Sequence, residues 1–422
     1  MKVEPSRRRD LAEYRGIVPE SEISRILSLA EEVSGLEVVH VNSTSFGGGV
    51  AEILHSMLPL MRSVGLKAEW EVLEAPPKFF NVTKLLHHGV QGMEVSLTKE
   101  MKELYLRVNK ENAERLDLEK NIIVIHDPQP LAIRAFRQDA GKWVWRCHID
   151  ASSPHKPVWD FLSRFVTLYD AYVFHMREYV QPGLNAGKAF IMPPSIDPLS
   201  EKNREMSEDE ALKVLEKYDV DPERPILIQV ARFDPWKDPL GAIDVYRKVR
   251  EREPGVQLLL VASMAHDDPE GWVYFEKAVR HAGEDYDVHF LTNLVGVGDR
   301  EVNAFQRMAD VALQMSIREG FGLAVTEALW KGTPVVARPA GGIRLQVIDG
   351  KTGFLVRNVA EAAERALVLI RNRKLRDKLG RAGREHVKRN FLITRHLRDY
   401  LQLYSRLVHG GVPPCYESRR AT

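Results

Sequence analysis

The chain has 422 residues, of which 44% are hydrophobic and 28% charged, and its formal net charge is +1. This length predicts two large domains, each able to bury its own core. The near-neutral charge gives no electrostatic footprint for nucleic acid, and no apolar run approaches the ~20 residues that a membrane helix needs.

Cysteine usage and the start of the chain bear on where the protein works. Only Cys147 and Cys415 are present, which argues against a disulfide framework and against a cysteine zinc site. The basic start of the chain is not followed by an apolar segment, so we expect no secretory signal. The cytoplasm is the expected location.

Strands and helices alternate along the first half of the chain, which predicts a parallel sheet with helices on both faces. Short apolar runs bounded by polar residues predict the strands. The expected strands are 36–41, 68–73, 121–125, 143–147, 171–174 and 189–192, and the expected helices are 20–33, 49–64, 98–116 and 156–168.

The run Met-Pro-Pro-Ser-Ile-Asp-Pro at 192–198 breaks this alternation, because its prolines deny any regular element. We place an inter-domain hinge here, with one domain at 1–195 and the next at 196–390. A helical, densely charged stretch at 360–408 ends the second series. The strands expected in that series are 225–231, 256–262, 287–291, 311–315, 334–337 and 354–356.

The predicted fold class is therefore α/β, with two doubly wound parallel sheets joined by a hinge. Two such halves place a cleft between the C-terminal edges of both sheets. Ligands of open α/β sheets bind at those edges. We therefore look for chemistry in the loops that follow the strands.

The most informative loop runs from Arg318 to Glu327, where two glutamates bracket a Gly-Phe-Gly turn. A strand precedes the turn, and a helix that stops at Gly332 follows it. The free N–H groups at the start of such a helix suit an anion such as phosphate. Glu319 and Glu327 can accept hydrogen bonds from vicinal hydroxyls, so a sugar nucleotide fits. The alternative is a glycine turn beside two solvated glutamates.

Arg232 and Lys237 follow the opening strand of the second series, so they point to the same edge. The planar fork of Arg232 and the compact charge of Lys237 suit a pyrophosphate. A surface salt-bridge pair is the alternative. The loop that begins at Arg338 follows the next strand and is expected beside the nucleotide or phosphate, with an ordinary turn as its alternative.

A glycine-rich loop, Phe-Gly-Gly-Gly-Val-Ala-Glu at 46–52, connects the first strand to a helix. Its glycines, among them Gly48 and Gly49, allow the backbone to approach a ligand closely. The loop lacks the G-x-G-x-x-G spacing of a dinucleotide fold.

Two further loops carry polar side chains at the ends of first-domain strands. His126 and Asp127 end the strand at 121–125, where they can meet substrate or simply form a helix N-cap. His148 and Asp150 follow the strand at 143–147 in a loop rich in groups that bind hydroxyls. The histidines at 126, 148 and 155 lack helical spacing, so we expect no metal site.

The spacing of a glutamate, seven residues and a second glutamate at 319–327 resembles the signature of the retaining GT-B glycosyltransferases of family 4. The resemblance implies two Rossmann-like domains that face each other across a cleft. It also implies that the C-terminal helix, about 391–422, packs back on the first domain. Tyr400 and Tyr404 would supply that contact.

The resemblance also implies a role for each candidate residue. Glu319 would touch the hydroxyls of the transferred sugar, and Glu327 would hold the ribose. The diphosphate would meet the side chains of Arg232 and Lys237 and the backbones of Gly48, Gly49, Gly322 and Leu323. Catalytic roles fall to His126, Arg232, Lys237 and Glu319, and the acceptor would be bound by Asp127, His148 and Asp150.

Within this family, the loops at 46–52, 126–130 and 145–152 resemble those of the archaeal and bacterial trehalose glycosyltransferring synthases. This implies reversible transfer of glucose from a nucleoside diphosphoglucose (UDP- and ADP-glucose among them) to free glucose, giving trehalose. It implies a homodimer and no bound cofactor, with magnesium at most stimulating the reaction through the nucleotide sugar. Another acceptor, a nucleotide-sugar epimerase and a non-catalytic sensor stay open as alternatives.

Overall fold

The structure, a computed structural model, describes residues 1–410 except 7, 47, 139–140 and 265–268. The chain forms two compact units. One contains residues 1–194 together with the chain from Ile393 onward, and the other contains residues 195–392. Each unit has a parallel six-stranded sheet covered by helices, so the predicted α/β fold with two doubly wound sheets is confirmed. The last part of the predicted C-terminal helix, with Cys415, lies outside the described residues.

The first unit has the strand order β2-β1-β3-β4-β5-β6, and all neighbours are parallel. The central strands consist largely of β-branched and aromatic residues that are buried on both faces, as expected where helices cover both sides of a sheet. The strands are β1 (Glu37–Asn42), β2 (Lys67–Val72), β3 (Ile122–His126), β4 (Lys142–Arg146), β5 (Ala171–Phe174) and β6 (Ala189–Ile191).

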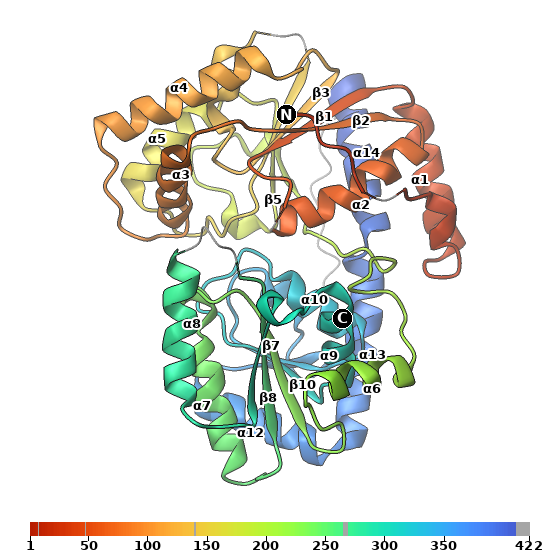
Figure 1. Cartoon of the computed structure of the whole chain (residues 1–422). Coiled ribbons are helices and arrows are strands. Elements are labelled where there is room, and N and C mark those ends of the chain that lie inside the picture. The colour runs from red at the N-terminus through yellow and green to blue at the C-terminus, as the bar shows by residue number, and fades with distance from the viewer. Residues whose placement is uncertain (7, 47, 139–140, 265–268, 411–422) are drawn as a thin grey trace. The chain divides into compact units, whose positions relative to one another are not determined.

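Helices of the first unit pack in two groups, which flank the sheet in Figure 1. One group joins α1 (Glu20–Glu32), α2 (Gly49–Ser63) and the last helix among the described residues, α14 (Ile393–His409). The other joins α3 (Pro77–Val90), α4 (Lys99–Arg115) and α5 (Lys156–Val166) with the 3-10 helix Leu131–Phe136. Helix α3 was not predicted. It packs on α5 through Gly89, where an added Cβ would lie 2.5 Å from Val158.

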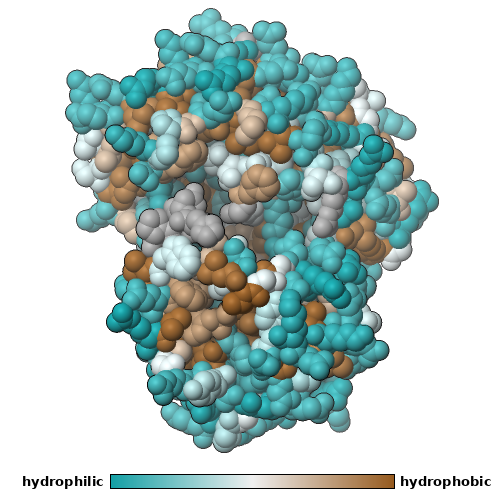
Figure 2. Space-filling view, in the orientation of Figure 1, coloured by the Kyte–Doolittle hydropathy of each residue, from teal (hydrophilic) through white to brown (hydrophobic). Residues whose placement is uncertain are grey.

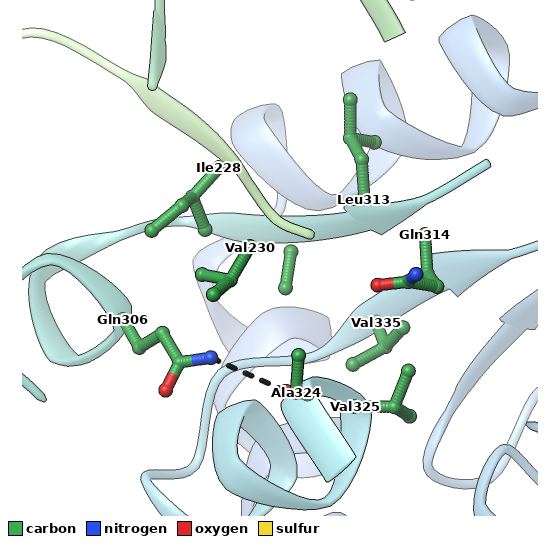
Figure 3. A pocket seen from close by; sticks show the side chains of 9 residues that line it. Ile228, Val230, Gln306, Leu313, Gln314, Ala324, Val325 and Val335 are labelled. Atoms are coloured by element: carbon green, nitrogen blue, oxygen red, sulfur yellow. Dashed lines mark hydrogen bonds between the residues drawn. The ribbon is translucent and has the colours of Figure 1, made fainter. Parts of the chain in front are cut away.

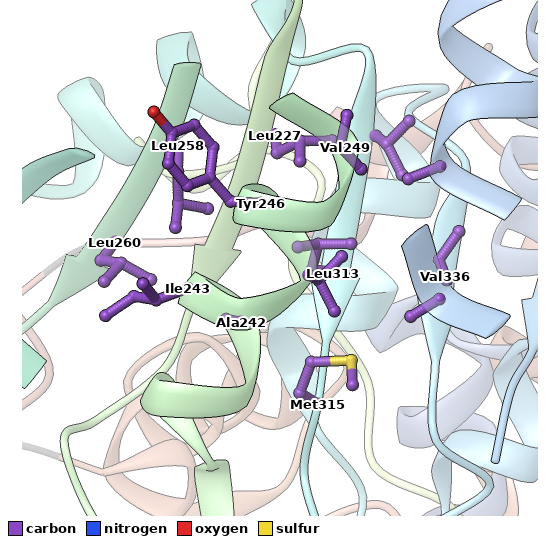
Figure 4. Close-up of a cluster of buried hydrophobic side chains, with 14 of the residues drawn as sticks. Leu227, Ala242, Ile243, Tyr246, Val249, Leu258, Leu260, Leu313, Met315 and Val336 are labelled. Atoms are coloured by element: carbon purple, nitrogen blue, oxygen red, sulfur yellow. The ribbon is translucent and has the colours of Figure 1, made fainter. Parts of the chain in front are cut away.

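The second unit has the strand order β12-β11-β10-β7-β8-β9, again parallel throughout. Its apolar core lies between the sheet and one helical layer, and Figure 4 shows Ile243, Tyr246 and Val249 facing Leu227, Leu258 and Leu313 of the strands. The strands are β7 (Ile226–Val230), β8 (Gln257–Ala262), β9 (Val288–Thr292), β10 (Val311–Gln314), β11 (Val335–Ala337) and β12 (Gly353–Leu355).

Helices of the second unit also fall into two packed groups. One contains α7 (Pro239–Arg250), α8 (Pro269–Ala282) and α12 (Val359–Arg371), and the other contains α6 (Glu208–Lys217), α9 (Asp299–Met308), α10 (Leu323–Trp330), α11 (Ile343–Gln346) and α13 (Arg373–Asn390). The stretch predicted as helical at 360–408 is thus three helices. Asn372 ends α12 and caps α13 by accepting from the Leu375 N–H. The short 3-10 helices are Leu11–Tyr14, Arg177–Tyr179, Ala186–Lys188, Pro235–Lys237 and Asn293–Val295.

Both strand orders contain a point where the chain reverses its direction of travel across the sheet. In the first unit this point lies between β1 and β3, and in the second between β7 and β10. Connections leave such neighbours in opposite directions, so a crevice opens at the carboxyl ends of the two strands, and ligands bind there. The second order, read along the chain, is that of dinucleotide-binding sheets.

The face of the molecule in Figure 2 is mostly hydrophilic, with small separate hydrophobic areas. Within the described residues, no helix combines the length and apolar character needed to cross a membrane.

Candidate functional site

The second unit brings Lys237 and Glu319 together at its reversal point. Lys237 follows β7 at the end of a short 3-10 helix, and Glu319 lies in the loop after β10. The Lys237 Nζ donates to the Glu319 Oε2 over 2.6 Å. Only 16% of the Lys237 side chain and 12% of the Glu319 side chain are exposed. A cation and a carboxylate are therefore held where the topology predicts ligand binding.

Side chains from the two strands hold this pair in place. The buried Gln229 of β7 donates to the Lys237 carbonyl oxygen over 3.1 Å and accepts from the Met315 N–H over 3.0 Å. The Ser316 hydroxyl lies 3.4 Å from the Glu319 Oε2 and donates to it. Gln229 thus ties the loop after β7 to the end of β10, and the Lys237–Glu319 distance depends on both.

The two predicted cations, Arg232 and Lys237, do not share a carboxylate. The Arg232 side chain is 63% exposed, and its Nη2 lies 3.3 Å from Asp234 Oδ2. Asp234 also accepts from the Lys237 N–H over 3.1 Å, so both cations are anchored to one loop. The loop after β11 adds a third cation, because Arg338 lies 2.7 Å from the carboxylate of Asp238, the residue that directly follows the 3-10 helix.

The predicted strand, glycine turn and helix are present at 311–330. Gly322 adopts φ +85° and ψ 71°, a left-handed conformation that favours glycine, and α10 begins at Leu323. The Val325 N–H donates to the Gly322 carbonyl oxygen over 3.0 Å. The N–H groups at the start of a helix carry a partial positive charge, which suits an anion. Gly322 also lies close to Glu319, whose Cγ would be 3.1 Å from an added Cβ.

Two glutamine side chains fix the start of α10 through hydrogen bonds, and the void behind the helix is too small for a ligand. Figure 3 shows the Gln306 amide donating to the Ala324 carbonyl oxygen, over 3.2 Å. Gln346 donates to the Phe321 carbonyl oxygen over 2.5 Å. The void between α10 and the sheet has a volume of about 10 Å³, which leaves room for about one water molecule and none for a sugar.

Glu327 lies in the second turn of α10 and is 2% exposed. Its Oε1 is 3.7 Å from the Lys202 Nζ, which in turn lies 3.8 Å from Asp299. The buried carboxylate is thus paired with a cation from the first residues of the second unit. Lys202 was not predicted, because nothing in the spacing along the chain connects it to Glu327.

In the first unit, histidines from four neighbouring strands form a row across the sheet. They are His40 in β1, His126 at the end of β3, His148 after β4 and His175 after β5. The His40 Nδ1 lies 2.9 Å from the His126 Nε2, and the His126 Nδ1 lies 2.9 Å from the His148 Nε2. The His148 Nδ1 lies 3.4 Å from the His175 Nε2. Sequence reasoning found His126 and His148 but missed the other two.

Asp127 has a φ of +62°, unusual for a residue with a side chain, and it packs against the end of β4. Its N–H donates to the Arg146 carbonyl oxygen, and its Oδ1 accepts from the His148 N–H over 2.7 Å. The alternative interpretation of Asp127 as a helix N-cap is therefore wrong. Asp127 is partly buried, and the loss of water around its carboxyl raises its pKa to about 7 despite the His148 N–H.

The buried Arg146 supplies positive charge beside the histidine row. Its guanidinium donates to the Met192 carbonyl oxygen over 3.1 Å and lies 5.3 Å from the centre of the Tyr400 ring. Burial, and then this charge, lower the pKa of His40 to about 3. Burial also lowers the pKa of His126 and of His148 well below 6.5, so all three rings are neutral at pH 7.

The remaining predicted residues lie in loops of the same unit. Asp150 is 4% exposed and accepts from the Ser152 N–H over 3.0 Å, so it shapes the loop after β4. Gly48 directly precedes α2, which begins at Gly49, and an added Cβ at Gly48 would meet no described atom within 4 Å. The space beside the Gly48 Cα is thus open.

Metal binding is not apparent at the histidine row. In the parts of the chain that the structure describes, no group of three or more His, Cys, Asp and Glu side chains is arranged to hold a metal ion.

Two protein families match the chain. Residues 40–181 match the family described as "Trehalose synthase, N-terminal domain", and residues 211–386 match "Glycosyl transferases group 1". The trehalose synthase of Pyrococcus horikoshii is 58% identical over 408 residues, which cover 96% of this chain and 98% of that protein. The trehalose synthase of Rubrobacter xylanophilus is 48% identical, with coverage of 94% and 97%.

The fold is also found among solved structures. The α,α-trehalose-phosphate synthase (UDP-forming) of Burkholderia vietnamiensis superposes with a TM-score of 0.69 at 16% identity. The superposition covers 89% of this chain and 98% of that one. At this identity the likeness concerns the fold alone.

Proposed function

Because the chain belongs to the trehalose synthase family of GT-B glycosyltransferases, we propose that it transfers glucose from a nucleoside diphosphoglucose to free glucose. The transfer retains the configuration of the anomeric carbon, so the product is α,α-trehalose, and the reaction is reversible. The observation that carries this proposal is the Lys237–Glu319 pair beside the first turn of α10, at the reversal point of the second sheet.

This pair suits a sugar diphosphate because it offers one group to each part of the donor. When the diphosphate binds, the Lys237 ammonium faces its phosphate oxygens together with Arg232 and the N–H groups of Gly322 and Leu323. The Glu319 carboxylate then accepts hydrogen bonds from the hydroxyls of the glucose. Glu327, which is buried in α10, accepts hydrogen bonds from the ribose hydroxyls.

The bond from the anomeric carbon to the phosphate oxygen breaks as the bond to the acceptor oxygen forms on the same face of the sugar. The departing phosphate oxygen takes the proton of the acceptor hydroxyl. Negative charge grows on the diphosphate in the transition state, and Lys237 and Arg232 stabilise it most strongly there. Retaining hydrolases use a carboxylate nucleophile instead, and the proposed step needs none.

The acceptor is bound by the first unit, through Asp127, His148 and Asp150. Asp127 and His148 are partly exposed, so their polar atoms can reach a sugar hydroxyl. His126 is 2% exposed, and both of its ring nitrogens are bonded to other histidines. We therefore propose that His126 does not touch the sugar and acts through its hydrogen bond to His148.

The experiment that tests this function combines the purified protein with UDP-, ADP- or GDP-glucose and free glucose, and identifies the products by carbon NMR. A symmetric disaccharide with two α-anomeric carbons is expected. Release of the nucleoside diphosphate with another sugar product would replace the acceptor assignment, and no turnover with any donor would refute the transferase.

A matched incubation tests the dependence on metal. We propose that no resident cofactor takes part, and that magnesium stimulates by binding the nucleotide sugar. A chelator should therefore lower the rate without abolishing it, and added magnesium should restore it. Complete and irreversible loss of activity after chelation would show a resident metal.

A further inference from the structure

The histidine row of the first unit continues to helix α14. The Tyr404 hydroxyl of α14 lies 3.2 Å from the His40 Nε2. The row therefore runs from Tyr404 through His40, His126 and His148 to His175, with four hydrogen-bonded contacts in series. Tyr404, His40 and His175 are almost fully buried, and His126 is 2% exposed.

Hydrogen-bond counting limits the states of this row. A neutral imidazole has one N–H donor and one bare nitrogen acceptor. His40, His126 and His148 each use both ring nitrogens within the row. Neutral rings therefore satisfy every contact only when all their N–H groups point the same way along the row, and a reversal at one ring forces a reversal at the next.

Tyr404 decides between the two directions. A phenol O–H is a stronger acid than an imidazole N–H, and an imidazole nitrogen is a stronger base than a phenol oxygen. The favoured contact is thus a Tyr404 hydroxyl that donates to the His40 Nε2. His40 must then carry its proton on Nδ1 and donate to the His126 Nε2, and His126 must do the same toward the His148 Nε2.

Solvent can reach one ring of the row, the ring next to His175. His148 is partly exposed, whereas the histidines on either side of it are buried. Its contact with His175, at 3.4 Å, is the longest of the series. With the direction set by Tyr404, the N–H of His148 lies on Nδ1, which can turn from His175 toward an oxygen atom of a bound sugar.

We propose that Tyr404 and His40 are positioning residues, which hold His126 and His148 in the Nδ1–H tautomer so that His148 offers a hydrogen-bond donor to a sugar oxygen. This deepens the proposed function and rests on it for the identity of the sugar. The tautomers themselves are a property of the free protein. The charged and titratable neighbours of the row include Arg146, Asp127, Tyr179, His396 and Tyr400.

The test is nitrogen NMR of the full-length protein labelled with ¹⁵N-histidine, without substrate, with signals assigned through single His→Gln variants. His40, His126 and His148 should each carry the proton on Nδ1. In Tyr404→Phe the phenol donor is lost, and these signals should move toward the Nε2–H form or a mixture. The matched control is Tyr169→Phe, which removes a buried hydroxyl that donates to the Leu131 carbonyl oxygen over 2.7 Å and does not touch the row.

Kinetics of the same variants give the second readout. One positioning hydrogen bond corresponds to about a tenfold change in rate. Tyr404→Phe should lower the kcat of transfer about tenfold and leave the KM of the nucleotide sugar unchanged, while Tyr169→Phe should stay within about twofold of the unmodified protein.

Either of two results would overturn the proposal: Nε2–H tautomers at these histidines in the unmodified protein, or an unchanged kcat in a Tyr404→Phe protein. The first measurement needs no variant that folds poorly. It also separates this proposal from the function, because the tautomers can be as expected in a protein that makes no trehalose.

Discussion

At the scale of single residues, Lys237 and Glu319 form a close ion pair, so each is the nearest opposite charge to the other. Their 2.6 Å contact places a proton donor of the lysine on the carboxylate oxygen that Ser316 also approaches. In the proposed reaction Lys237 leaves this contact for the diphosphate. The contact therefore holds both side chains in a fixed orientation until the donor arrives.

Lys237→Ala should lower kcat by about 10²–10³, because a preorganised donor that faces growing charge is worth that much in the transition state. The affinity for the nucleotide sugar should fall far less. Steady-state kinetics and titration calorimetry measure the two effects, with Lys213→Ala on the exposed face of α6 as control. Equal losses in affinity and turnover would contradict the role.

Glu327→Ala should act mainly on binding. Its carboxylate is 2% exposed and pairs with Lys202, so removing it deletes a buried acceptor and leaves Lys202 with Asp299. We expect nucleotide binding to weaken by about 1–3 kcal/mol with little change in kcat. Calorimetry with the nucleoside diphosphate measures this, and Glu385→Ala on the exposed face of α13 serves as control. A large fall in kcat at saturating donor would argue against a ribose contact.

Some of these residues can be predicted from the sequence alone, and others cannot. Glu319, Glu327, Arg232 and Lys237 are found because each lies at a fixed offset from a strand end or a glycine turn. Lys202 and Tyr404 meet their partners only through the tertiary fold, so no local pattern marks them. His40 is marked in the sequence only as a polar residue inside the apolar run Val-Val-His-Val at 38–41. That run predicts a strand whether or not the histidine has a function.

At the scale of elements, α13 supports α10 through two glycines. An added Cβ at Gly380 would overlap the carbonyl oxygen of Gly332, just past the end of α10. At Gly383, one turn on, the nearest atom would be Leu329 Cδ2 at 2.8 Å. The first neighbour is backbone and cannot move alone, whereas the second is the end of a flexible side chain.

Gly380→Ala should therefore lower the free energy of unfolding by about 1–3 kcal/mol, because overpacking outweighs the better helix propensity of alanine. Gly383→Ala, its matched control on the same helix, should be close to neutral. Guanidinium denaturation measures both. Similar stabilities of the two variants would show that α13 can shift away from α10.

Elements were predicted well where their pattern is local. The strand predictions differ from the structure by at most one residue at either end, because short apolar runs between polar residues mark buried parallel strands. Helix α3 was missed because its close approach to α5 through Gly89 is a tertiary feature. The break at Asn372 is a capping signal, but dense charge on both sides hides it.

At the scale of the whole molecule, the buried histidines make stability depend on pH. The pKa of His40 is lowered to about 3, and those of His126, His148 and His396 are lowered well below 6.5, in each case chiefly by burial. Below pH 6.5 the unfolded chain binds protons that the folded protein does not, so stability falls as the pH falls. Asp127, whose pKa is raised to about 7, acts in the opposite direction between pH 4 and 7.

The free energy of unfolding should therefore fall between pH 6.5 and 5, by roughly 1.4 kcal/mol per pH unit for each histidine that stays neutral, less the effect of Asp127. Denaturation with urea at a series of pH values measures the slope. His40→Gln should make the slope shallower, while His281→Gln, at a partly exposed site beside Asp244, should not. An unchanged stability across this range would show that the histidines protonate in the folded protein.

Alternation of strands and helices predicts two doubly wound sheets, but it does not predict their strand orders. Whether β3 pairs with β1 or with β2 depends on which side of the sheet each crossover takes, and residues 122–125 are apolar in either case. The reversal points, and with them the neighbours of His126 and Lys237, therefore emerge only with the fold.

The membership of α14 in the first unit also has a consequence for how the protein is made. Ribosomal synthesis proceeds from the N-terminus, and domains generally fold as units during it. Residues 1–194 are synthesised before the second unit, yet α14, which packs on α1 and α2 and supplies Tyr404, is synthesised after the whole of the second unit. The second unit can thus complete its fold on the nascent chain before the first does. A chain that stops before residue 393 would contain the four histidines of the row but lack the Tyr404 hydroxyl that sets the direction of their N–H groups.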